Sequence, residues 1–186
     1  MPKNDYQASY VLPARLVPTF KEEALRRELE EALTRLSINA GIVTSRESLV
    51  VRDVLPNADL GLATNSWLSP ALVANTEVTF VTVALGNRRH LAFYGVSTES
   101  AAPSISMIYF RIGATGSSTF LLANLEGLYA EQETVGYFSE PVIYVPNETV
   151  FVRVLPRVTN AAGERIRLHA LIAEPKGEAV SSKRYF

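Results

Sequence analysis

Most of the chain between Thr76 and Ala173 consists of short apolar segments that alternate with polar residues and are separated by turn residues. Alternation with a period of two residues is typical of β-strands that bury one face. Ser48–Leu55 is rich in β-branched residues and adds a further strand. No strand alternates with a helix here, which argues against a parallel α/β sheet. The pattern predicts a mainly β fold, an antiparallel two-sheet sandwich or single jelly roll of about eight or nine strands.

Turn residues divide this stretch into its strands. Gly86 and Asn87 form a two-residue hairpin signal, and Asn160–Gly163 has the composition of a hairpin loop, so we expect each to join two neighbouring antiparallel strands. Residues 56–59 are predicted to form a turn, and Asn124–Glu133 has room for one helical turn. The side chains expected to face the core in the last two strands are Val150, Val152, Val154, Ile166, Leu168, Ala170 and Ile172.

Residues 20–36 are predicted to form an amphipathic helix, which ends near Asn39 and Gly41. Apolar residues recur on one face with the helical period: Phe20, Ala24, Leu25, Leu29, Ala32, Leu33 and Leu36. A narrow apolar stripe on a charged helix has to lie against another surface. That surface is either the β-domain of the same chain or another copy, in which case Leu25, Leu29, Leu33 and Leu36 form an assembly interface.

The two ends of the chain are expected to be extended arms. Pro13 and Pro18 oppose helix formation in residues 1–20, which still contain the apolar side chains Tyr6, Tyr10 and Leu12. The last residues are polar until Tyr185 and Phe186. Either these segments are plain termini, or their aromatic residues contact neighbouring subunits. The chain therefore divides into an N-terminal arm and helix (1–41), a β-sandwich domain (42–174) and a C-terminal tail (175–186).

Composition excludes several classes of function. The 186 residues carry a net charge of -1, from 18 basic and 19 acidic residues, so the basic field of a general nucleic-acid-binding protein is absent. The chain contains no cysteine, which excludes disulfides and zinc–thiolate sites. No apolar run approaches the ~20 residues of a membrane helix, and the first residues do not resemble a signal peptide. We expect a protein made in the cytoplasm, without membrane insertion or direct contact with nucleic acid.

The sequence indicates no catalytic site, metal site or cofactor. The two histidines, His90 and His169, are isolated in strand patterns, without the ligand spacing of a cupin-type metal enzyme. Arg165, Arg167 and His169 follow one another at intervals of two residues and therefore share a strand face. This stripe either binds an anion or an acidic partner, or is simply a polar face in contact with solvent. We expect that the protein is not an enzyme.

A jelly-roll domain over residues 42–173, with an extended N-terminal segment, a helix and a tail, resembles small single jelly-roll viral (phage) capsid or capsid-associated proteins. The resemblance is architectural and depends on strand number, the two hairpin signals and the terminal arms. It implies a virion protein that assembles with copies of itself and with another capsid subunit, through arms exchanged between neighbours. Residues 1–20 contain only Lys3 and Arg15 as basic residues, unlike capsid arms that bind the genome.

A carbohydrate-binding or adhesion β-sandwich is the alternative. Sugar sites use exposed aromatic faces, and the candidate rings are those of Trp67, Tyr94, Tyr109 and Tyr129. This alternative requires at least two of the four rings to be coplanar on one surface.

Overall fold

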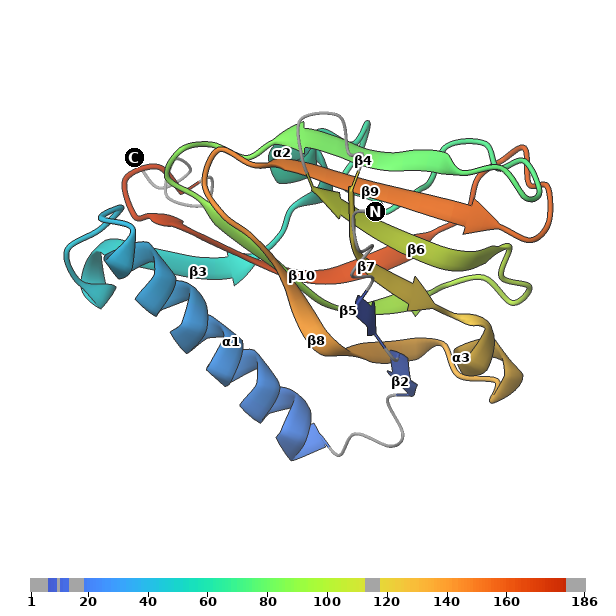
Figure 1. Ribbon diagram of the computed structural model, residues 1–186, viewed down its shortest axis with the longest axis horizontal. Coiled ribbons are helices and arrows are strands. Elements are labelled where there is room, and N and C mark those ends of the chain that lie inside the picture. The colour runs from blue at the N-terminus through green and yellow to red at the C-terminus, as the bar shows by residue number, and fades with distance from the viewer. Residues whose placement is uncertain (1–6, 10, 14–18, 113–117, 180–186) are drawn as a thin grey trace, which may run out of the picture.

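The structure is a computed structural model that describes residues 7–9, 11–13, 19–112 and 118–179. Two five-stranded sheets pack face to face, and one long helix lies along one side of this sandwich (Figure 1). The strands are β1 (Gln7–Ser9), β2 (Val11–Pro13), β3 (Leu49–Asp53), β4 (Val78–Ala84), β5 (His90–Thr98), β6 (Ile105–Ile112), β7 (Ser118–Asn124), β8 (Val135–Tyr144), β9 (Thr149–Pro156) and β10 (Ile166–Pro175). The helices are α1 (Thr19–Asn39), α2 (Pro56–Leu60) and α3 (Glu126–Ala130), with a 3-10 turn, η2 (Arg46–Ser48).

The strand order is that of a single jelly roll. One sheet has the order β1-β7-β6-β9-β4 and the other the order β2-β8-β5-β10-β3. Among the strands from β3 to β10, the first pairs with the last, β4 pairs with β9, β5 with β8 and β6 with β7, all antiparallel. This nested pairing is a long antiparallel hairpin rolled into two sheets. The predicted fold class is confirmed.

Both predicted hairpins are wrong. Gly86 and Asn87 connect β4 to β5, and Asn160–Gly163 lies between β9 and β10, but each of these strand pairs is divided between the two sheets. Gly163 has a φ of +74°, and a Cβ on it would lie 2.2 Å from the carbonyl oxygen of Ser69. Turn chemistry therefore shows where the chain reverses, whereas the sheet that the next strand joins depends on distant partners.

The main core lies between the two sheets. The residues predicted to face inward on β9 and β10 are all buried there, which confirms the alternation. Aromatic rings fill the centre: Phe110 lies 5.1 Å from Phe93 and 5.4 Å from Phe138, measured between ring centroids. The Tyr144 hydroxyl lies 3.0 Å from the carbonyl oxygen of Arg111, so its polar atom is satisfied inside the core.

A second core lies between α1 and the outer face of the sheet that contains β5 and β10. Leu29 and Leu33, with 3% and 0% of their surface exposed, pack there with Tyr94, Tyr137 and Leu171. Strands β5 and β10 are therefore buried on both faces. The helix ends where Gly41 adopts a φ of +69°, with the N–H of Ile42 bonded to the carbonyl of Ser37 and that of Gly41 to Ile38.

Shorter elements differ from expectation in one place. The turn predicted at residues 56–59 is the short helix α2, which begins with Pro56 and ends at Gly61 in the left-handed conformation. Proline at the first helical position and glycine after the last are typical helix signals, so the sequence contained this information. The helical turn expected within Asn124–Glu133 is present as α3.

Candidate interaction surfaces

The described part of the N-terminal arm, residues 7–9 and 11–13, adds one short strand to an edge of each sheet. β1 runs parallel to β7, with Ala8 opposite Leu122. β2 runs antiparallel to β8, with Leu12 opposite Tyr137. The arm thus passes from one sheet to the other and covers the edge strands β7 and β8 on one side of the sandwich (Figure 1). Of the predicted arm contacts, Leu12 lies in β2, whereas Tyr6, Tyr10, Tyr185 and Phe186 lie outside the described residues.

The apolar stripe of α1 is used within the chain. Leu29 and Leu33 are buried against β5, β10 and β3, which removes both from the surface available to a second copy. Leu25 and Leu36 are only partly buried. The prediction of an assembly interface along the whole stripe is therefore corrected: its two central residues dock the helix on its own sheet. The physical reason is that β5 and β10 present an apolar outer face that also has to be covered.

Arg167 and His169 lie on β10 and Arg165 lies directly before it, but the three do not form a positive triad. The His169 ring lies 5.8 Å from the Tyr94 ring and 6.1 Å from the Tyr137 ring. Burial, reinforced by the charge of Arg167, lowers the pKa of His169 to about 4, so its imidazole is neutral at pH 7. Arg165 lies 3.7 Å from Glu99. The stripe therefore offers less positive charge to an anion than the spacing suggested.

A network of two arginines and two carboxylates joins α2, β3, β10 and the segment before β5. Arg52 lies between two buried carboxylates: its Nη1 and Nη2 donate to Asp59 at 2.7 and 2.9 Å, and its Nε donates to Glu174 at 2.8 Å. Nη2 of Arg89 lies 2.9 Å from the other Glu174 oxygen. Burial alone would lower the pKa of Arg52, but its bonds to Asp59 and Glu174 raise it. Sequence spacing gave no sign of this network, because Glu174 lies far along the chain from both arginines.

A third buried carboxylate, Glu164, holds three loops together at one end of the sandwich. It accepts hydrogen bonds from the backbone N–H groups of Ser104 and Ile105 at 2.6 and 3.2 Å, and from the hydroxyl of Thr98 at 3.3 Å. Its own N–H donates to the Ser69 hydroxyl at 2.9 Å. Asp59, Glu164 and Glu174 thus each accept at least one hydrogen bond from a protein donor, as is usual for buried polar groups.

Beside Glu164, a pocket of about 370 Å³ opens between the β5–β6 loop and the residues that follow α3. Thr98, Pro103 and Tyr129 contribute to its walls. The Tyr129 hydroxyl is buried and has no hydrogen-bond partner among the described residues, and burial raises its pKa. The guanidinium of Arg157 lies 5.4 Å from the centre of the Tyr129 ring.

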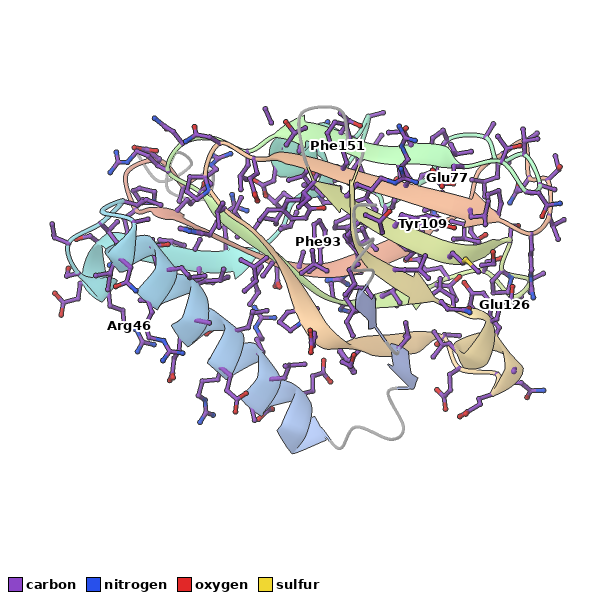
Figure 2. The ribbon with its side chains drawn as sticks, in the orientation of Figure 1. Arg46, Glu77, Phe93, Tyr109, Glu126 and Phe151 are labelled. Atoms are coloured by element: carbon purple, nitrogen blue, oxygen red, sulfur yellow. The ribbon has the colours of Figure 1, made fainter. Side chains whose placement is uncertain are left out.

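The four rings of the carbohydrate alternative lie on different parts of the molecule. Trp67 packs on Phe80, with ring centroids 6.4 Å apart, and Tyr94 is buried beneath α1. Tyr109 lies on β6 (Figure 2), with the guanidinium of Arg111 5.4 Å from its ring centre. Tyr129 lies at the loop pocket. No two of these four rings pair with each other in the described part of the chain. The coplanar platform that a sugar site of this kind requires is not formed by these residues.

The described residues contain no group of three or more histidine, aspartate or glutamate side chains placed to hold a metal ion. Within the same residues, no helix combines the length and apolar character needed to span a bilayer.

Comparison with known proteins does not assign this chain to a family. No protein-family model matches the chain, and no curated protein sequence matches it. Among solved structures, a chain from the Bacillus endospore appendages, which form a family of disulfide-linked pili, is similar at 13% identity and a TM-score of 0.35. The alignment covers 69% of this chain and 88% of that chain. This likeness is too low to transfer any property of those pili, and the present sequence contains no cysteine.

Proposed function

We propose that this chain is a structural subunit that assembles with copies of itself, and that it serves in a virion as a capsid or capsid-decoration protein. In that role it contacts further copies and another capsid subunit, performs no catalysis and does not touch nucleic acid directly. The single observation that carries the proposal is the N-terminal arm, which binds as an edge strand to both sheets of a single jelly roll.

The energetics of the arm favour exchange between copies. β1 and β2 are three residues long, and each backbone hydrogen bond contributes about 0.5–1.5 kcal/mol net, so the arm is held by a few kcal/mol. A neighbouring copy offers the same two edges with the same bonds. Transfer of the arm to a neighbour therefore costs little and links the subunits, as in domain swapping.

Exposed apolar side chains on the loop before β4 and the loop after β9 support a contact surface there. Leu68, Val73 and Val158 are 45%, 54% and 55% exposed. Backbone bonds between Leu72 and Asn160 join the two loops that carry Val73 and Val158. Apolar side chains gathered on loops that are themselves fixed in place are typical of surfaces that a partner covers.

Light scattering on the full-length chain and on a variant lacking residues 1–13 tests the proposal. We expect the full-length chain to form particles larger than a monomer, and we expect the arm deletion to reduce their mass while circular dichroism stays that of a β fold. A full-length chain that remains monomeric at all concentrations, with the same mass as the deletion variant, would contradict the proposal.

A further inference from the structure

Strand β4 is an open sheet edge. Among the described residues it pairs only with β9, and it runs along the upper margin of the molecule in Figure 1. The arm covers the edge strands on the opposite side, β7 and β8. The remaining edge strand, β3, carries Arg52 and Asp53 in its five residues. Of the described edges, β4 is therefore the long one that is neither covered nor charged.

Some backbone N–H and C=O groups of β4 face away from β9. The N–H of Leu85 donates to the carbonyl of Glu148 at 2.8 Å, so Leu85 faces β9. Along an antiparallel strand, the backbone N–H and C=O groups of successive residues point alternately toward and away from the neighbouring strand. Between Val81 and Ala84 the register against β9 has no shift, and Val83 lies opposite Val150. Val81, Val83 and Leu85 thus bond to β9, whereas Thr82 and Ala84 direct their N–H and C=O groups outward. Both residues are exposed, and these groups have no partner in the described part of the chain.

The sequence of β4 lacks most of the features that protect an edge from pairing. VTFVTVA contains no charge and no proline, and five of its seven residues are valine or threonine. Its one protective feature is the irregularity between Thr79 and Val81, which shifts the register against β9. The regular open segment is therefore residues 81–85.

We propose that this segment pairs antiparallel with the same segment of a second copy, about a two-fold axis at Val83. Thr82 then lies opposite Ala84 of the partner subunit, and the two five-stranded sheets become one continuous sheet. This inference rests on the proposed function and specifies one of its contacts. The second copy is the occupant because β4 is the one long edge among the described strands that is neither charged nor covered, and the edges of β1 and β2 are only three residues long. A head-to-tail contact requires two different open edges, whereas a two-fold contact requires one.

The test uses full-length chains with Thr82→Pro or Thr82→Lys. Proline removes the outward N–H of Thr82 but leaves the bonds of Val81 and Val83 to β9, so the fold can survive while the edge loses a donor. Lysine places like charges close together across the two-fold axis. We expect each variant to raise the dissociation constant of the pair at least tenfold in sedimentation velocity. Thr44→Lys, at an exposed threonine in the loop after α1, is the matched control and should leave it unchanged.

Amide hydrogen exchange on the unmodified chain provides a second readout that does not depend on a variant folding. The amides of Thr82 and Ala84 should become protected as concentration rises, whereas those of Val81 and Val83 should be protected throughout. Assemblies in which Thr82 and Ala84 exchange freely would overturn the β4 pairing and leave the proposed function standing. A chain that stays monomeric throughout would overturn both.

Discussion

Arg52 is the residue on which the buried charges of this fold depend. It bridges Asp59 and Glu174, and the side chains of both carboxylates are fully buried. Removing one partner of a buried ion pair leaves an uncompensated charge in a medium that solvates it poorly, which costs more than the pair contributes as a whole.

Arg52→Met should therefore lower the free energy of unfolding by about 3–5 kcal/mol in urea denaturation at pH 7. Arg46→Met is the matched control, because Arg46 is exposed, and it should change stability by less than about 0.5 kcal/mol. Equal losses in the two variants would show that the network does not depend on Arg52.

His169 gives the fold a dependence on pH. Its folded-state pKa of about 4 lies below its ordinary value of 6.5, so the unfolded chain binds the proton more tightly. The stability it confers is complete above pH 6.5 and is lost as pH falls from 6.5 towards 4, by about 3 kcal/mol at most. Arg167 opposes protonation, whereas Glu22 and Asp53 favour it.

His169→Gln should accordingly unfold with a smaller pH dependence than the unmodified chain between pH 7 and 5. The measurement is the urea midpoint at several pH values in this window. The remaining dependence includes that of His90, whose pKa is also lowered by burial. Superimposable pH profiles would indicate that His169 titrates normally.

Among the elements, helix α1 covers the outer face of the sheet that contains β5 and β10 of its own chain. Leu33→Ala should lower the free energy of unfolding by about 2–5 kcal/mol, since it empties a fully buried site between α1 and the sheet. Leu36→Ala, at a partly buried position of the same helix, should lower the free energy of unfolding by a smaller amount. Both losses should be independent of protein concentration. A loss at Leu33 that disappears on dilution would place the stripe between copies instead.

Sequence reasoning located the elements well but did not determine their partners. Period-two alternation identifies β9 because only one of its faces is buried in the main core. Strand β5 is buried on both faces, with Phe93 in the main core and Tyr94 beneath α1, so alternation says little there. The glycine and asparagine signals marked real reversals, but the strands on either side belong to different sheets.

The candidate surfaces were less predictable than the elements. The two-residue spacing predicts that His169 shares a strand face with two arginines, but the lowered pKa of His169 results from its burial, which the spacing does not show. The carboxylates Glu164 and Glu174 accept hydrogen bonds from donors that are distant in the chain, which no local pattern encodes. The open edge of β4 is also invisible in sequence, because it depends on what the arm covers elsewhere.

In the molecule as a whole, the strand edges on one side of the sandwich are covered and those on the other side are not all covered. On one side the arm covers the edge strands β7 and β8, whereas on the other side β4 is exposed. One face is covered by α1. The opposite face carries a polar cluster in which Arg111 contacts Glu77 at 2.6 Å and Arg153 lies 3.4 Å from the same carboxylate. Under the proposed function, the arm and β4 would provide two different lateral contacts between copies.

Self-assembly is tested by the mass of the purified full-length chain. We would measure this mass by sedimentation velocity over a hundredfold range of concentration and image the same samples by negative-stain electron microscopy. If the chain assembles with copies of itself, we expect discrete particles that are multiples of 20.4 kDa and whose population grows with concentration. A single species of 20.4 kDa over the whole range, with no regular particles in the images, would contradict it.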